Sequence, residues 1–327
     1  MSDLERRYLR LLRAYPADYR RERGDEIVGT YLDLAGPGRR RPSPADAADL
    51  VRGGLRQRLR AAGATDLAPG VRLAAVLALA TATFLAGFWM INELRPPPAD
   101  WGVPRFGPFV SVGVIAWLGW LTVPALALVA PGRPTRAVTA VAVLATAAVP
   151  VVSVLTGSPR PPLYALVPQV ALGMLALAVD ARPALPARAL PGAAAIGGAA
   201  AADVTTWHGS YWGWDEYGTE QLLPWAGGTL LVVAMLLAVG LAMRHDGRGG
   251  WAALALLTPV GLLGVHPLAG AIDGLDGAPQ PTYPTMLGTA VVIGLLGPLI
   301  LPLTVVLRRR RRPAAPARSC PTCGAQR

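Results

Sequence analysis

The chain lacks lysine entirely and has few charged residues of any kind. All 31 of its basic residues are arginine, and charged residues make up 16% of its 327 residues, against about a quarter in soluble domains. This shortage of charge excludes an ordinary soluble protein. The absence of lysine, together with abundant Ala, Arg, Gly and Pro, is typical of a high-GC bacterial gene.

Two kinds of sequence signature are also missing. The first 20 residues contain no apolar core of a secretory signal peptide, so the first membrane span is expected to act as an uncleaved signal anchor. The HExxH, P-loop, GxSxG and dinucleotide-binding motifs are absent as well. We therefore expect a non-enzymatic protein, although a membrane enzyme without a compact motif stays open.

Long apolar segments dominate the rest of the chain. A bilayer core about 30 Å thick requires about 20 apolar residues per helix. The fifth segment is the weakest, since it is rich in Ala and Gly and contains Pro191 and Asp203. Eight segments meet the requirement: 71–92, 109–130, 137–156, 163–179, 189–207, 222–243, 251–272 and 286–307.

The placement of arginine supports eight spans. With eight spans and a cytoplasmic N-terminus, 28 of the 31 arginines lie on the cytoplasmic side, and only Arg95, Arg105 and Arg160 lie outside. Without the fifth span, every later segment changes sides and 12 arginines lie outside. Because cytoplasmic loops collect basic residues, we predict eight spans in the plasma membrane with both termini in the cytoplasm.

The predicted fold is therefore an all-α integral membrane bundle with a small cytoplasmic helical domain before it. We expect residues 1–65 to form that domain, 66–307 the bundle and 308–327 a basic cytoplasmic tail. The run Arg308 to Arg312 directly follows the last span, where it attracts anionic lipid headgroups by about 1 kcal/mol per basic residue. We expect no nucleic-acid partner, since the arginines of residues 1–72 are interleaved with acids.

The N-terminal residues predict three short amphipathic helices. Pro16 ends the first, and Gly36-Pro37-Gly38 ends the second. The apolar sides of these two helices comprise Leu4, Tyr8, Leu11, Leu12 and Tyr15, and then Tyr19, Ile27, Val28, Tyr31 and Leu34.

A capping signal starts the third helix. Ser43 is its expected N-cap, Pro44 takes the first helical position, and Asp46 can answer the cap. Its apolar stripe consists of Ala48, Val51, Leu55 and Leu59. Because sixty residues make only a marginal core, we expect this domain to lean on the membrane, on a second copy of the chain or on a partner.

The first 60 residues resemble the permease-prefix type of N-terminal domain. Residues 6–16 read RRYLRLLRAYP and residues 19–27 read YRRERGDEI, which gives a helix ending in Tyr-Pro, an aromatic residue plus Arg, then Gly-x-Glu and an apolar run. In bacteria, actinobacteria in particular, such domains precede the membrane regions of ABC-type permeases and of proteins encoded near PadR-type regulators. The resemblance implies a cytoplasmic regulator or ATPase as partner. It does not extend to those permeases' large extracytoplasmic domains, because the longest outer loop predicted here has about 16 residues.

One predicted outer loop gathers aromatic and acidic residues. With Glu220 nearby, it could bind an organic cation through cation–π contacts. The alternative is an interfacial aromatic belt at headgroup depth. The candidate ligand-binding residues of this loop are Trp207, His208, Trp212, Trp214, Asp215 and Glu216.

Asp203 is a carboxylate inside the fifth predicted span. Such a residue usually faces the bundle interior and marks a site or relay. His266 in the seventh span and Gln169 in the fourth are its candidate partners, although backbone carbonyls could satisfy both. Small residues on the fifth span, among them Gly197, favour close helix contact, so this span is expected to be central.

The predicted tail ends in a cysteine pair. Cys320-Pro321-Thr322-Cys323 matches half of a zinc ribbon, but structural zinc takes four ligands and the chain has only two cysteines. A zinc site would need Cys320 and Cys323 from each of two chains. A redox pair and a flexible tail with reduced thiols are the alternatives.

These features predict a signalling or accessory membrane protein whose N-terminal helices dock a cytoplasmic partner. A transporter or permease component with a polar site near Asp203 is the first alternative. A membrane enzyme acting on lipid, with the loop at 207–220 as its only candidate site, is the second.

Overall fold

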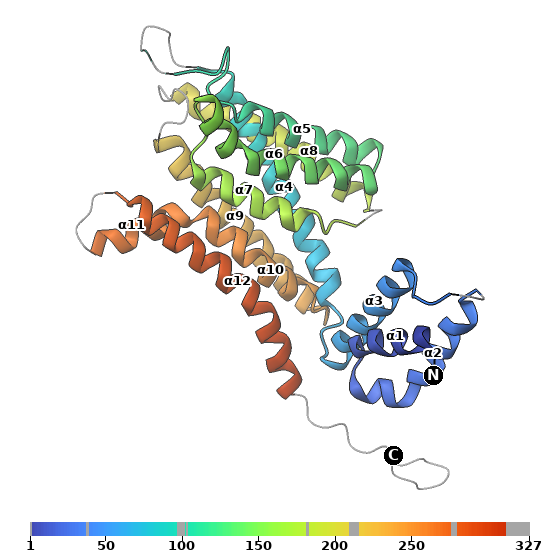
Figure 1. The fold of residues 1–327 in the computed structure, drawn as a ribbon. Coiled ribbons are helices and arrows are strands. Elements are labelled where there is room, and N and C mark those ends of the chain that lie inside the picture. Colours follow the sequence, from blue (N-terminus) through green and yellow to red (C-terminus); the bar gives the residue numbers. More distant parts are fainter. Residues whose placement is uncertain are drawn as a thin grey trace. The chain divides into compact units, whose positions relative to one another are not determined.

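The computed structural model describes residues 2–36, 39–96, 102, 104–180, 183–208, 216–275 and 280–311, with the backbone alone at 205–208, 216–220 and 308–311. Every regular element in these ranges is a helix (Figure 1). The chain divides into two compact units, the first comprising Met1–Leu67 and Leu301–Arg327 and the second comprising Ala68–Ile300.

Three helices and one 3-10 turn form the N-terminal part of the first unit. They are α1 (Asp3–Leu11), η1 (Leu12–Ala14), α2 (Ala17–Leu34) and α3 (Pro44–Ala61). Ser2 and Glu5 make a capping box at the start of α1. The sequence prediction for α3 is confirmed: Ser43 caps it, Pro44 is its first residue, and Asp46 completes a second capping box.

The first unit has a core of its own, and α3 meets that core through an unexpected face. Tyr8 and Leu50 are both 1% exposed, and Leu4, Leu12, Tyr15 and Val28 complete the core. Gly54 faces the same way, where a Cβ atom would lie 2.7 Å from the backbone of Ala14. The α3 helix thus buries Leu50 and Gly54, not the apolar stripe expected from its sequence.

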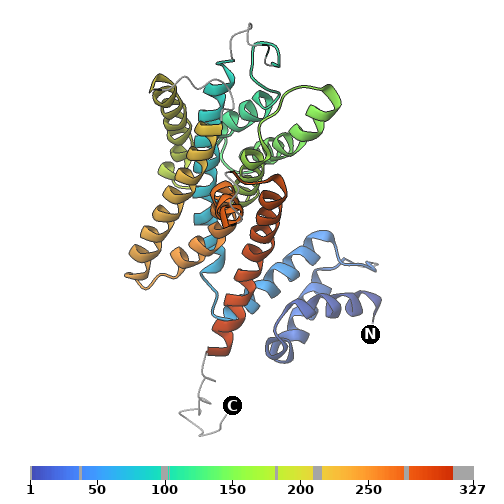
Figure 2. The same ribbon diagram turned by 90° about the vertical axis from the view of Figure 1, so that its left-hand side faces the viewer.

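The second unit contains the remaining helices, with α4 running through its middle in both views (Figures 1 and 2). They are α4 (Leu67–Glu93), α5 (Val114–Val129), α6 (Arg133–Thr156), α7 (Leu163–Ala176), α8 (Leu185–His208), α9 (Glu216–Ala242), α10 (Arg248–Leu263), α11 (Val265–Leu275) and α12 (Tyr283–Arg311), the first and last of which extend beyond the unit's limits.

All eight predicted spans fall on helices, but fewer helices are long enough to cross a membrane. Among the described residues, four qualify by length and composition: α4, α6, Gln221–Ala242 of α9 and Tyr283–Leu307 of α12. A fifth is obtained if α10 and α11, bent by 60° at their junction, form one span. The α5 and α7 helices have 16 and 14 residues, which at about 1.5 Å per residue is short of a bilayer core. The fold is a helical bundle with four or five candidate spans.

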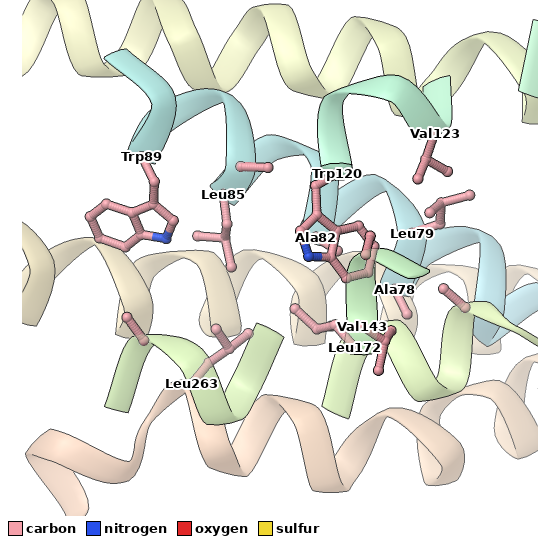
Figure 3. Packing of buried hydrophobic residues seen from close by; sticks show 14 of the residues in the cluster. Ala78, Leu79, Ala82, Leu85, Trp89, Trp120, Val123, Val143, Leu172 and Leu263 are labelled. Atoms are coloured by element: carbon pink, nitrogen blue, oxygen red, sulfur yellow. The ribbon is translucent and has the colours of Figure 1, made fainter. Parts of the chain in front are cut away.

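Alanines of α4 pack against large side chains in the core of the second unit. Figure 3 shows Ala82 of α4 beside Trp120 of α5, with Leu85 of α4 between Trp89 and Trp120. Because lipid tails are as apolar as leucine, helices in a membrane gain from close van der Waals packing instead of from escape from water. Small residues on α4 allow that packing.

The α4 and α8 helices run parallel in close contact, which we call the α4–α8 seam. The Thr83 hydroxyl donates to the Pro191 carbonyl at 2.9 Å, and a Cβ atom at Gly87 would lie 2.1 Å from the Ala195 carbonyl oxygen. A Cβ atom at Gly198 would lie 1.9 Å from the Phe84 carbonyl oxygen, whereas Gly197 faces open space. The fifth predicted span is therefore tightly packed, through Gly198 and not through Gly197.

Candidate functional site

Three of the four residues in the apolar stripe of α3 are exposed, and we call them the α3 face: Ala48, Val51 and Leu55; the fourth, Leu59, is half-buried. Val51 is 38% exposed and Leu55 is 54% exposed. The exposed arginines Arg52 and Arg56 lie beside them on the same helix. An exposed apolar stripe bordered by cations can bind an apolar surface that carries acidic groups at its edge.

The tyrosines of the first unit belong to its core, as their place on the predicted apolar sides implies, with Tyr19 and Tyr31 partly buried against it. Tyr8 and Tyr15 are buried, and Tyr19 stacks on Tyr15 with ring centroids 5.5 Å apart. The Tyr31 hydroxyl donates to the Asp49 carboxylate at 2.6 Å. These contacts fix how α1, α2 and α3 pack together.

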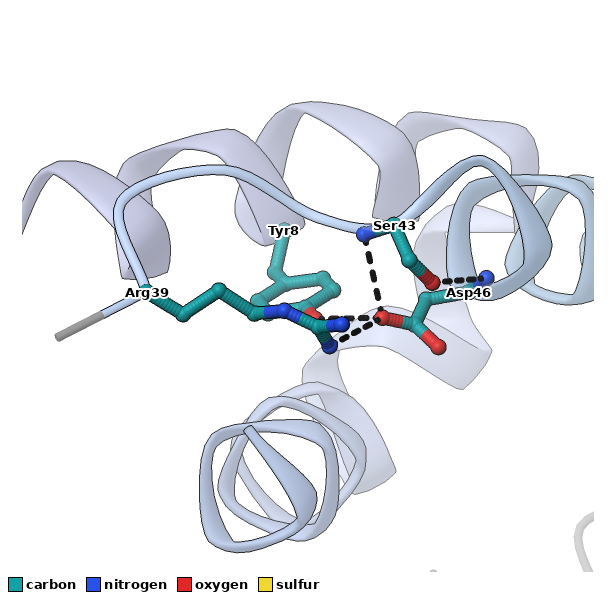
Figure 4. Close-up of polar contacts among 4 residues, drawn as sticks. All are labelled: Tyr8, Arg39, Ser43 and Asp46. Carbon is teal, nitrogen blue, oxygen red and sulfur yellow. Dashed lines mark hydrogen bonds and ion pairs between the residues drawn. The ribbon is translucent and has the colours of Figure 1, made fainter. Parts of the chain in front are cut away.

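Asp46 is the polar junction of the unit (Figure 4). Its carboxylate accepts hydrogen bonds from the Ser43 backbone N–H at 3.1 Å and from the Tyr8 hydroxyl at 3.2 Å. Arg39 pairs with the same carboxylate at 3.5 Å. The hydrogen bonds from the Ser43 side chain and backbone hold the pKa of Asp46 below its ordinary value, with smaller contributions from Tyr8 and Arg39.

Burial changes the acidity of the tyrosines in the opposite direction. Burial, followed by the hydrogen bond to Asp46, raises the pKa of Tyr8. Burial, followed by the hydrogen bond to Asp49, raises the pKa of Tyr31 far above its ordinary value. Both hydroxyls are therefore protonated donors at neutral pH, and they stabilise the arrangement that leaves the α3 face outward.

In the second unit, Asp203 pairs with Arg95 at 2.5 Å. The Asp203 side chain is 66% exposed and that of Arg95 is 37% exposed. A second ion pair, Arg72 with Asp180 at 3.1 Å, lies near the other end of α4. The two arginines are separated by about 35 Å at 1.5 Å per helical residue, slightly more than the thickness of a hydrocarbon core. This separation suits two ion pairs that lie at the two membrane surfaces better than a polar relay at mid-depth.

The described contacts of Gln169 and His266, the candidate partners of Asp203, are with groups other than Asp203. Gln169 is fully buried, and its amide donates to the Ala82 carbonyl of α4 at 3.0 Å. The His266 ring lies 5.5 Å from the ring of Tyr164. The structure thus describes an ion pair for Asp203, a hydrogen bond for Gln169 and a ring contact for His266, each with a different partner.

Glu93, which the sequence analysis did not single out, is the fully buried carboxylate of α4. It accepts hydrogen bonds from the Ser111 backbone N–H at 2.7 Å and from the Ser111 hydroxyl at 2.5 Å. The Val110 N–H also donates to the Glu93 carbonyl at 3.2 Å. Glu93 therefore fastens the segment before α5 to the end of α4. No sequence signal shows that residue 111 reaches Glu93.

Several candidate residues cannot be placed. Trp212, Trp214 and Asp215, as well as Cys320 and Cys323, lie outside the described residues. The side chains of Trp207, His208 and Glu216 are also outside the description, although their backbones belong to α8 and α9. Within the described part of the chain, no cluster of three or more His, Cys, Asp or Glu side chains could hold a metal ion.

A scan against protein-family models, a search of curated proteins and a search of solved structures each found no match. The similarity of residues 1–60 to permease-prefix domains therefore remains a prediction from sequence motifs.

Proposed function

We propose that this chain is a multi-pass membrane protein with a signalling or accessory role, whose N-terminal unit docks a cytoplasmic protein through the α3 face. One observation carries the proposal. The α3 helix packs on its own core through Leu50 and Gly54 and leaves Val51 and Leu55 exposed. Since the unit already has a core without that stripe, the stripe is available to bind a partner.

The chemistry of the α3 face indicates the kind of partner. Its two large side chains are aliphatic, and arginines border them, so the complementary surface is apolar with carboxylates at its edge. Helices that lie on a membrane surface commonly use Trp, Phe and Leu over a broad apolar face. The α3 face is narrow and has no aromatic residue, which favours a protein over the bilayer.

The proposed topology places this unit in the cytoplasm. Eight crossings put 28 of the 31 arginines on the cytoplasmic side of the plasma membrane, along with both termini. Four or five helices that are long enough to span, together with the two ion pairs near the ends of α4, support a membrane-embedded bundle. In this proposal, residues flanking α5 and α7 would complete their crossings.

The partner's class separates the remaining alternatives. A captured transcriptional regulator would place the protein in signalling, and a captured ATPase would make it a permease component. A polar transport site near Asp203 would need that residue to be accessible along a path through the bundle. In this structure the Asp203 carboxylate is paired with Arg95.

In-cell photo-crosslinking from the α3 face tests the proposal. A photoreactive amino acid replaces Leu55 in the full-length protein, and a matched variant carries it at Arg60, an exposed position on another side of α3. We expect one cytoplasmic protein to be captured from position 55 and not from position 60. A Val51→Asp substitution should abolish that capture, because it places a carboxylate in the apolar contact.

The opposite results are equally specific. Capture of lipid alone from position 55 would assign the α3 face to the membrane surface. Capture of a second copy of the chain would assign it to a homodimer. Equal capture from positions 55 and 60 would show that the α3 face has no special role. Each of these results contradicts docking of a cytoplasmic protein.

A further inference from the structure

The second unit contains an apolar cavity of about 260 Å³ between α7, the α10–α11 junction and α12. Its wall includes Leu163, Val167, Leu262, Met286, Leu287 and Ala290. An apolar space of roughly 150 Å³ is large enough to bind an apolar ligand. A larger apolar space is therefore suited to an apolar occupant.

The cavity has one cationic residue, Arg160, in the segment just before α7. Arg160 is half-buried and, within the described part of the chain, makes one hydrogen bond, to the Pro161 carbonyl at 3.1 Å, and no ion pair. A guanidinium has five N–H donors in a planar fork that suits phosphate or carboxylate. Most of this donor capacity is available to a ligand.

The cavity lies where a membrane lipid can reach it. Tyr164 comes from the first turn of α7 and Tyr283 from the first turn of α12, so the cavity is at the helix ends and not at mid-length. Tyrosine is typical of headgroup depth in membrane proteins. Tyr283 is 57% exposed and Leu287 is 56% exposed, so the wall opens onto the outer surface of the bundle.

We propose that this cavity holds one acyl chain of a membrane phospholipid, with the phosphate of that lipid bound by Arg160. A volume just below the range of about 300–1,000 Å³ that is common for drug-sized ligands fits one chain and not a whole amphiphile. Tyr164, which lines the cavity, has the His266 ring 5.5 Å from its own ring. The placement of this lipid in the outer leaflet rests on the proposed topology. The binding of its acyl chain in the cavity does not.

The test uses the full-length protein in nanodiscs of phosphatidylglycerol and phosphatidylcholine that contain a phospholipid with a photoreactive group near its acyl end. We expect labels to concentrate on Val167 and Leu287. Ala290→Trp should reduce those labels to background by filling the cavity, whereas Val292→Trp, on an exposed position of α12, should leave them unchanged. Val167→Phe, from the opposite wall, should act like Ala290→Trp.

The phosphate contact has a separate readout. Native mass spectrometry after mild delipidation should show one retained phospholipid, and Arg160→Gln should reduce its retention by about tenfold, as expected for the loss of a charge-assisted hydrogen bond. Arg105→Gln, at another arginine predicted on the outer side, should have no effect. Since Arg160 is half-exposed, its variant should fold even if a cavity-filling variant does not.

Two results would overturn the proposal. One is labelling spread evenly along α12, with Val292 and Leu295 labelled as strongly as Leu287 and no response to Ala290→Trp, which identifies ordinary boundary lipid. The other is equal lipid retention by the wild type and Arg160→Gln, which removes the phosphate contact from the proposal.

Discussion

The two units of this protein use polar and apolar side chains in opposite ways. The first unit keeps an apolar stripe at its surface, with Val51 and Leu55 exposed, and surrounds it with arginines. The second unit fully buries polar residues, among them Glu93, Thr83 and Gln169, and each makes at least one hydrogen bond, although the Gln169 Oε1 atom accepts none within the described part of the chain. In one unit the unusual residues are apolar and outside, and in the other they are polar and inside.

This difference follows from what surrounds each unit. In water, exposed apolar area is unfavourable, so an exposed stripe on a unit that already has a core indicates a contact still to be made. In a bilayer, an unsatisfied polar group is costly, so buried polar residues find partners inside the bundle. In the proposed function the α3 face is a binding surface, whereas the hydrogen bonds of Glu93 and of the Gln169 amide join neighbouring segments of the second unit.

The largest effect is expected at the α4–α8 seam. Gly198→Leu would force a side chain against the Phe84 carbonyl, because even a Cβ atom there would lie 1.9 Å from that oxygen. We expect a loss of at least about 3 kcal/mol, above the middle of the range for overpacking, with poor recovery of folded protein. Gly197→Leu, which faces open space, is the matched control, and equal behaviour of both variants would disprove the seam.

The next effect contrasts two leucines of α3. Leu50→Ala should cost about 2–5 kcal/mol, since a buried leucine leaves a cavity. Leu55→Ala should change stability by less than about 0.5 kcal/mol, as surface substitutions do. Hydrogen exchange of α1 to α3 in the full-length protein measures both. Similar losses for the two would mean that Leu55 is part of a core.

In the second unit, the loss of a buried carboxylate should cost more stability than the loss of a half-exposed one. Glu93→Ala leaves the Ser111 N–H buried without its acceptor, which should cost about 1–3 kcal/mol. Asp180→Ala, which breaks a half-exposed ion pair with Arg72, should cost no more than about 1 kcal/mol. Thermal unfolding in detergent compares the two, and a larger loss for Asp180 would contradict the anchoring role of Glu93.

A smaller effect is expected from Tyr31→Phe, which removes the hydrogen bond to Asp49 and should cost about 0.5–1.5 kcal/mol. Because the pKa of Tyr31 is raised in the folded unit, its contribution is complete below the ordinary pKa of 10.0 and is lost as the pH rises above it. The wild-type unit should therefore lose stability above that pH, and the Tyr31→Phe variant should lose less. Hydrogen exchange at matched intrinsic rates follows both changes, with Tyr19→Phe as the control.

The smallest effect is expected at Asp203. Asp203→Asn removes the charge that pairs with Arg95, but both side chains are substantially exposed, so the loss should be at most about 1 kcal/mol and should shrink at high salt. Thermal unfolding at two salt concentrations measures it. A loss of transport without a loss of stability would instead support the transport alternative.

Sequence patterns located the helices well and their faces less well. The capping box of Ser43 and Asp46 was predictable because it is local, and the eight apolar segments all proved helical. The burial of Leu50 in place of Val51 and Leu55 was not predictable, because an apolar stripe by itself does not show which face of a helix packs. Gly54 decides the face by allowing α3 to approach Ala14. The pairing of Glu93 with Ser111 depends on a loop path that no local pattern encodes.

Co-isolation tests the central claim most directly. Wild-type protein and the variants Leu55→Asp and Arg60→Asp are purified in a mild detergent from the native host, and the cytoplasmic proteins that accompany each are quantified by mass spectrometry. The account predicts that one protein accompanies the wild type and Arg60→Asp, and is lost from Leu55→Asp, while hydrogen exchange shows an intact unit in all three. The same protein recovered in equal amounts with Leu55→Asp would contradict docking through the α3 face.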